Sequence, residues 1–274
     1  MPFAEFEEKT FEQQLTRELL SRRSLFFPPG QMLENSLGFD VALFTHRRHF
    51  WRMFPDAPFF MPWRRGIDLD VDYLPSYRFN LFIQYKRPEF LNSPLASEWT
   101  DWHRLYYRYD LNTNQQATLL DLANRVGRQA LVVYASAAFH TYQELWNHAR
   151  RRELFLFSNY TNAQDLNGHS RYSYADPGHE GFAHSESARI EGHDLFELMN
   201  SLIAGKSERT NQQFLVDLGK VADGILSKSS HFSEQYLQIK KLGEFQEFRN
   251  AFDVFRVMSI FTLFTNSVWL IGTE

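Results

Sequence analysis

Two polar residues lie near the end of an apolar stretch in "RFNLFIQYKRPEF", residues 78 to 90. The run 79–83 is typical of a buried strand, and Pro88 ends it. Because side chains two positions apart in a strand point to the same face, Gln84 and Lys86 are expected to lie together. An amide oxygen is a hard ligand for a divalent cation, and an ammonium group stabilises the charge that develops at an attacked phosphate. The pair therefore predicts metal-assisted phosphoryl chemistry.

Such a site also needs carboxylates, and the strand-like stretch "SLGFDVALFT" supplies Asp40. A second source is "GIDLDVDYL", where Asp68, Asp70 and Asp72 alternate with apolar residues. That period of two is typical of a solvated edge strand, which favours Asp40 as the metal ligand. Asp72 lies nearer to Gln84 in the sequence and stays the alternative.

A further carboxylate is expected from a helix. Residues 5–22 have helical periodicity, and Glu18 shares the stripe of Phe11 and Leu15, so it would face the sheet. Glu34 precedes Asp40 closely enough to meet it in space. We rank Glu18 first and Glu34 second.

The elements around these residues follow a recognisable order. A helix at 5–22 precedes the strand of Asp40, the strand "FIQYK", a helix at 113–126 and a strand at 130–135. Asn112 or Thr113 is the expected N-cap of the second helix, whose polar start holds Gln115 and Gln116. Alternating helices and strands indicate an α/β fold.

Over residues 5–140 this order and its motifs resemble the PD-(D/E)xK, or restriction-endonuclease-like, nuclease superfamily, in its Mrr-like Q-x-K variant. The resemblance implies a central mixed sheet and a site in which Asp40, Gln84, Lys86 and a helix glutamate act. It assigns Asp40, Gln84 and Glu18 to Mg²⁺ or Mn²⁺. It also implies hydrolysis of phosphodiester bonds in DNA, within restriction or antiphage defence. Asp40 and Gln84 are 44 positions apart, so an insertion at about 46–75 is expected.

The chain divides into three regions by pattern. Residues 1–158 would form the nuclease core with its insertion, and the polar residues 159–191 a loop or lid. Residues 192–274 are predicted to be helical and to contribute no metal ligand. There Phe245, Phe248, Phe252, Phe255, Ile260 and Leu263 recur at spacings of three to five. Such an apolar face suits the core or a homodimer, since two active sites related by a two-fold axis would cut both strands of a duplex.

Composition narrows the function classes. The net charge of −4 argues against a nucleic-acid coat protein, although basic clusters such as 150–152 can still form a local strip. With no cysteine there is no disulfide framework, thiolate zinc site or cysteine nucleophile, which suits the cytoplasm. The N-terminus lacks the pattern of a signal peptide, and no stretch reads as a clean membrane span.

Other chemistries find little support in the sequence. There is no phosphate-binding G-x-x-x-x-G-K-[S/T] motif and no G-x-S-x-G elbow, and the histidine spacings fit no usual zinc pattern. The alternative to a nuclease is an inactive nuclease fold, or a helical module, that binds nucleic acid or a protein partner in a defence complex.

Overall fold

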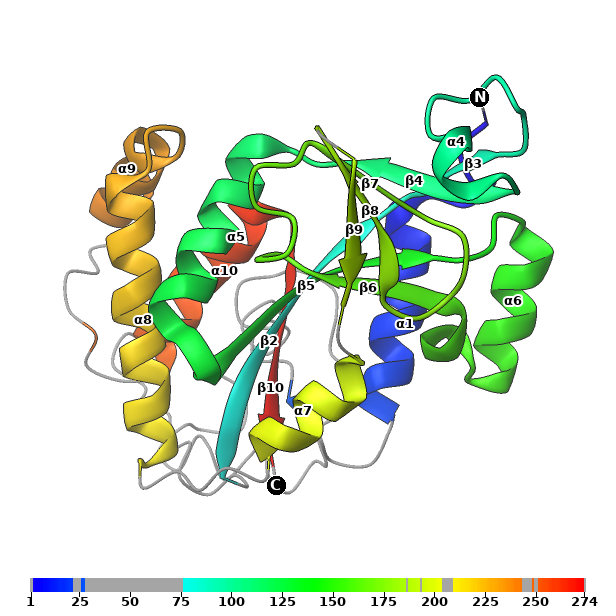
Figure 1. Ribbon diagram of the computed structural model, residues 1–274. Coiled ribbons are helices and arrows are strands. Elements are labelled where there is room, and N and C mark those ends of the chain that lie inside the picture. Colours follow the sequence, from blue (N-terminus) through cyan, green and yellow to red (C-terminus); the bar gives the residue numbers. More distant parts are fainter. Residues whose placement is uncertain are drawn as a thin grey trace.

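The computed structural model describes residues 2–21, 26–27, 76–185, 187–192, 194–203, 209–242, 248 and 251–273. These residues form two β-sheets with helices packed around them, a mixed α/β fold as the sequence predicts (Figure 1). The helices are α1 (Glu8–Ser21), α4 (Trp99–Trp102), α5 (Thr113–Val126), α6 (Tyr142–Arg151), α7 (Leu195–Ile203), α8 (Asn211–Lys228), α9 (Ser233–Leu242) and α10 (Ala251–Thr265), with short 3₁₀ turns η1 (Gly127–Gln129) and η2 (Leu154–Phe157). The strands are β1 (Phe26–Phe27), β2 (Tyr77–Lys86), β3 (Glu89–Leu91), β4 (Tyr106–Asp110), β5 (Ala130–Ala137), β6 (Ser158–Asn162), β7 (Arg171–Tyr174), β8 (Glu180–His184), β9 (Ala188–Glu191) and β10 (Val268–Thr273).

The first sheet has the strand order β1-β10-β2-β5-β6. β2 lies parallel to β5 and antiparallel to β10, so both of its edges are paired. Both β2 and β5 are almost continuously apolar and buried, as expected of central strands covered on both faces. Their register places Gln84 beside Tyr134 and Lys86 beside Ser136.

The two faces of this sheet have different coverings, which Figure 1 shows on opposite sides of β2. Odd-numbered β2 residues such as Ile83 and Tyr85 pack with Phe11 and Leu15 of α1 and with residues of α6 and α7. Even-numbered residues such as Phe82 pack instead with residues of α5, α8 and α10. Because Gln84 and Lys86 are even-numbered, they belong to the face of α5 and α10.

Local sequence signals fix the ends of α5. The Asn112 side chain accepts hydrogen bonds from the backbone N–H groups of Asn114 and Gln115, so it caps the helix as predicted. Gly127, at φ 58°, ends it in a backbone conformation that favours glycine. Gln115 is thereby held in the first turn, close to the end of β2.

The region 159–191 differs from the expected loop or lid. It holds the end of β6 and strands β7, β8 and β9, which extend a second antiparallel sheet of order β3-β4-β7-β8-β9. Buried tyrosines of this sheet, including Tyr109 and Tyr172, pack into the core shared with α5. Polar residues recur here because they alternate with the tyrosines and lie on the opposite face of the sheet, where Arg171 pairs with Asp110.

The C-terminal region is helical as predicted from α7 to α10, but it ends in a strand that the sequence prediction missed. Asn266, at φ 47°, follows α10, and the chain then runs as β10 between β1 and β2. Gly272 fits there because a Cβ would lie 2.2 Å from the Phe79 ring. β10 therefore contributes a strand to the central sheet. None of the described helices is both long and apolar enough to cross a lipid bilayer.

Candidate active site

Gln84 occupies the carboxyl end of β2 and is 1% exposed. Its Nε2 donates to Oε1 of Gln115 at 2.8 Å and to the backbone oxygen of Thr265 at 2.9 Å. A carbonyl oxygen can only accept, so Thr265 fixes which atom of the amide is the nitrogen. The Gln84 amide thus satisfies one of the carbonyls left open at the end of α10.

The other atom of that amide, Gln84 Oε1, is buried and has no hydrogen-bond partner among the described residues. An unsatisfied buried acceptor costs free energy, and such atoms are uncommon in folded proteins. Its two hydrogen bonds hold the amide so that this oxygen cannot turn toward another donor. The arrangement presents one oriented hard oxygen at the end of the sheet.

Lys86 lies two residues beyond Gln84 on β2, on the same face of the strand. Its Nζ is 5.6 Å from the centroid of the Tyr134 ring. Burial lowers the pKa of Lys86, and the negative charges of Glu8 and Asp110 oppose that shift. Within the described ranges no carboxylate lies within 4 Å of this ammonium, so its charge is available to an anion.

Tyr134 of β5 lies next to both Gln84 and Lys86: it pairs with Gln84 in the sheet, and its ring lies under the Lys86 ammonium. Its hydroxyl is buried and, among the described residues, has no hydrogen-bond partner. Burial raises its pKa well above the usual value, so the phenol stays protonated at neutral pH. The Tyr134 hydroxyl is therefore a second buried polar group without a partner among the described residues, on the residue that pairs with Gln84 in the sheet.

Two carboxylates approach this end of β2 that sequence reasoning did not single out. Glu8 Oε1 accepts a hydrogen bond from Asn266 Nδ2 at 2.9 Å, which ties the start of α1 to the end of α10. Asp110 Oδ1 accepts from Arg171 Nε at 2.6 Å. The available signal for Asp110 was its position at the end of a strand, two residues before the α5 cap. Glu8 carried no signal beyond its place in the first turn of a helix.

Glu18, predicted as the helix carboxylate, lies on the other face of the sheet. It is 5% exposed, and its carboxylate accepts from the backbone N–H groups of Leu154 at 2.8 Å and Phe155 at 3.3 Å. These bonds satisfy the donors at the start of η2. The structure therefore brings Gln84 and Lys86 together and does not bring Glu18 to them.

The remaining predicted carboxylates, Asp40 and Glu34, lie outside the described residues, as do the competing Asp68, Asp70 and Asp72 and the insertion at about 46–75. In the part of the chain that the structure describes, no three Asp, Glu or His side chains converge as a metal site would require. Gln84 is the predicted ligand that the described residues place in a suitable environment.

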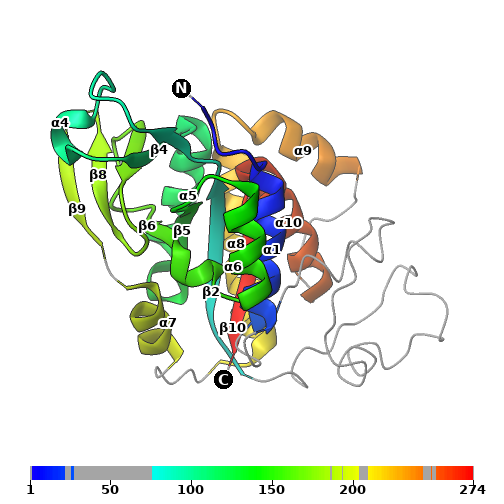
Figure 2. The same ribbon diagram turned by 90° about the vertical axis from the view of Figure 1, so that its right-hand side faces the viewer.

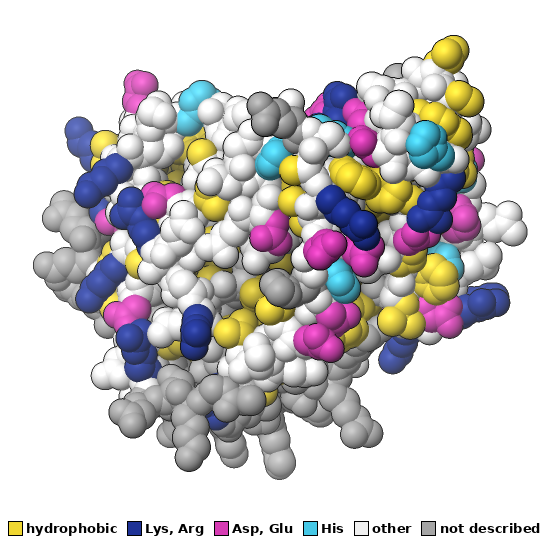
Figure 3. Space-filling model, in the orientation of Figure 1, with side chains coloured by type: hydrophobic (Ala, Val, Ile, Leu, Met, Phe, Trp, Pro, Cys, Tyr) yellow, Lys and Arg dark blue, Asp and Glu magenta, His cyan; other side chains and the backbone are white. Residues whose placement is uncertain are grey.

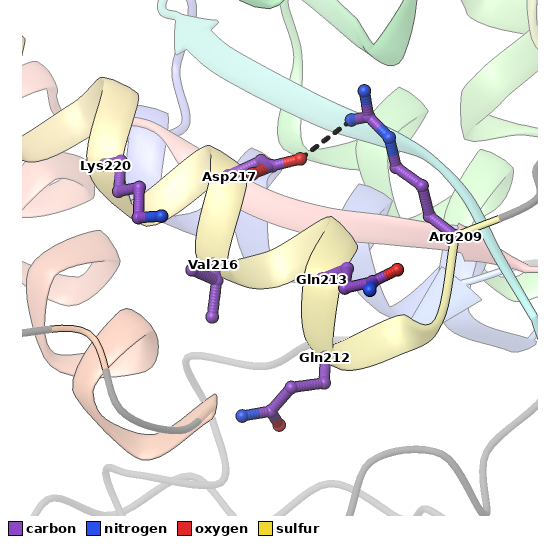
Figure 4. Close-up of a pocket in the computed structure, with 6 residues that line it drawn as sticks. All are labelled: Arg209, Gln212, Gln213, Val216, Asp217 and Lys220. Atoms are coloured by element: carbon purple, nitrogen blue, oxygen red, sulfur yellow. Dashed lines mark hydrogen bonds and ion pairs between the residues drawn. The ribbon is translucent and has the colours of Figure 1, made fainter.

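A separate hollow lies at the start of α8 (Figure 4). Arg209 and Asp217 form an ion pair of 2.9 Å across it, and Lys220 lies one turn further along the helix. Because Arg209 and Asp217 neutralise each other, the net charge of this hollow is that of Lys220 alone.

Comparison of the chain with protein-family models, curated proteins and solved structures yields no match. The functional interpretation therefore rests on the residues and their geometry.

Proposed function

We propose that the chain is a divalent-metal-dependent nuclease with a restriction-endonuclease-like core, which hydrolyses phosphodiester bonds in DNA. The proposal rests on one observation: Gln84 Oε1 and the Lys86 ammonium lie on the same face of β2, and among the described residues neither has a hydrogen-bond or ion-pair partner. This observation supports the proposal because such a site would use an oxygen ligand and a positive charge on one strand face.

The donor set of the described residues suits a hard cation. Gln84 Oε1 would be one ligand of Mg²⁺ or Mn²⁺, and binding there would remove the cost of burying it unsatisfied. The carbonyl end of α10 adds negative potential at the same point. Asp40 is the carboxylate that the sequence assigns to the metal, with Asp72 as its rival. A bound cation would polarise the phosphate and lower the pKa of a coordinated water.

Lys86 would stabilise the negative charge that develops on the phosphate oxygens. Its Nζ is held over the Tyr134 ring, and burial strengthens its interaction with an anion. Only the protonated amine can play this role, which ties activity to the lowered pKa of Lys86. A preorganised donor of this kind typically contributes about 10²–10³ in rate.

The partners follow from this chemistry. DNA is the proposed substrate, cleavage of both strands is most simply achieved by a homodimer, and restriction or antiphage defence is the proposed setting. A binding module without catalysis is the second candidate, because Gln84 also ties α5 to α10 and could serve the fold alone.

Cleavage assays separate the two candidates. Supercoiled plasmid should be nicked or linearised in Mg²⁺ or Mn²⁺ and left intact in excess EDTA. Asp40→Asn and Lys86→Met should each slow cleavage about 10²–10³-fold, whereas the matched variants Asp72→Asn and Lys220→Met should not. Undiminished cleavage in EDTA would refute metal dependence, and an intact plasmid with a folded, DNA-binding protein would favour the binding module.

A further inference from the structure

A groove runs between α1 and α6, on the opposite side of the sheet from Gln84 and Lys86. Its walls include Gln14, Arg17 and Ser21 of α1 and Trp146, Arg150 and Arg152 of α6 and its C-cap. The α1 residues are three and four positions apart, and Trp146 and Arg150 of α6 are four apart, so each helix presents one face to the groove. Figure 2 shows the two helices alongside each other.

The groove carries net positive charge. Three arginines line it, and the acid among its walls is Glu18, whose carboxylate is bound to the backbone N–H groups of Leu154 and Phe155. Within the described ranges, Arg17 and Arg150 have no carboxylate within 4 Å. In Figure 3 basic side chains project from the right-hand side, where Figure 1 places α6. Such unneutralised guanidinium groups attract a polyanion and bind phosphate in a bidentate manner.

Trp146 adds an aromatic surface to the same groove. Its side chain is 51% exposed, which is unusual for a residue that normally buries most of its area. It lies one turn from Arg150, so an aromatic face and a phosphate-binding group are adjacent. Interleaved aromatic and arginine side chains are the pattern by which proteins hold unpaired nucleic-acid strands, with bases stacked and phosphates paired.

The shape of the groove separates this partner from an anionic membrane. A lipid surface would meet a convex apolar face, whereas these residues line a hollow between two helices. The stretch from Gln14 to Ser21 rises about 10 Å, the length of about two or three nucleotides. A duplex keeps its bases stacked inside and would leave the indole without a partner.

We propose that this α1–α6 groove binds single-stranded nucleic acid, with a base stacked on Trp146 and phosphates on Arg17 and Arg150. The site uses no residue of the proposed metal centre, so it stands whether or not the chain cleaves DNA. It would hold an unpaired strand on the face opposite Lys86.

Fluorescence anisotropy of a labelled 12-nucleotide dT oligomer, measured in EDTA with the full chain, tests the groove without any cleavage. Trp146→Ala should weaken binding about 10–100-fold. Arg17→Gln and Arg150→Gln should each reduce the slope of log K against log salt by about 0.7. The matched controls Leu263→Ala and Arg128→Gln alter an exposed leucine and an exposed arginine elsewhere, and should change neither.

Three results would overturn the proposal. One is binding of the oligomer that survives Trp146→Ala, and another is an equal affinity for a blunt 12-base-pair duplex. The third is groove-dependent binding to vesicles containing phosphatidylserine in place of the oligomer, which would assign the groove to a membrane surface. Preference for the single strand, lost in the groove variants and kept in the controls, would support it.

Discussion

Mg²⁺ or Mn²⁺ should stabilise the folded protein through Gln84, whether or not a substrate is present. The buried Oε1 has no hydrogen-bond partner among the described residues, and leaving such an acceptor unsatisfied costs about 1–3 kcal/mol. A cation at one hundred times its dissociation constant adds about 2.7 kcal/mol to the free energy of unfolding. For a chain of this size each kcal/mol raises Tm by about 2–4 °C, so the expected rise is roughly 5–10 °C.

Gln84→Met isolates this effect because it keeps the length of the side chain and removes the oxygen. The variant should start from a lower Tm, since two acceptors, the Thr265 carbonyl and Gln115 Oε1, lose their donor while only one unsatisfied oxygen is removed. Its metal-dependent rise should then be absent. Lys86→Met should keep the rise or enlarge it, because a nearby positive charge is removed.

Differential scanning calorimetry with increasing Mg²⁺ or Mn²⁺, reversed by EDTA, measures these shifts. Gln164→Met is the matched control, since Gln164 is an exposed glutamine that binds Asn124 on the surface. If Gln84→Met gained as much Tm from the metal as the wild type, the buried amide would not be a ligand.

Three further outcomes follow from single residues. Burial lowers the pKa of Lys86, so cleavage that needs its ammonium should fall as pH rises. A pH–rate profile should show this fall with an apparent pKa below the ordinary lysine value of about 10.4. A fall at or above that value would contradict the role of Lys86 in catalysis. Glu18→Gln should lower the free energy of unfolding in urea by about 1–3 kcal/mol, because one of its amide partners loses an acceptor; unchanged stability with a lost metal response would instead make Glu18 a ligand. Burial alone would raise the pKa of Glu98, but hydrogen bonds from Ser97, Tyr106 and Arg108 and the Arg108 charge outweigh it and lower the pKa to about 2. The ionised Glu98 contributes about 3 kcal/mol to the free energy of unfolding above its unfolded pKa of about 4.3, and this contribution is lost as pH falls toward 2. Glu98→Gln should therefore make the urea midpoint less dependent on pH over that range, whereas the exposed control Glu191→Gln should not.

The elements that sequence reasoning found are those with local signals. α5 lies where its apolar stripe and its Asn112 cap predict, and β2 and β5 follow from their apolar runs. Strand alternation also placed Gln84 and Lys86 on one face without knowledge of the fold. Each of these inferences needs only neighbours within one helix turn or one strand.

The missed elements depend on contacts that are distant in the sequence. The apolar sequence of β10 predicts the end of a helix, because its residues become a strand only by pairing with β2. The hydrogen bond from Gln84 to Thr265 likewise joins residues that are 181 positions apart. The polar sequence of 159–191 predicts a loop, because nothing in it indicates the sheet in which these residues pair as strands. Glu18 fitted the stripe that faces the sheet, yet periodicity could not reveal which face of β2 that stripe would meet.

The packing of the C-terminal segment gives a reason for glutamine, in place of the acid more usual in such motifs, at position 84. The nitrogen of the side chain donates to the carbonyl oxygen of Thr265, and its oxygen has no partner in the part of the chain that the structure describes. A glutamate would set a carboxylate oxygen against that carbonyl, so two acceptors would face each other in a buried place without a proton between them. An amide resolves the conflict because it donates at one end and accepts at the other. The residue that would bind the cation is thus also the residue that anchors the end of α10, through the Thr265 carbonyl.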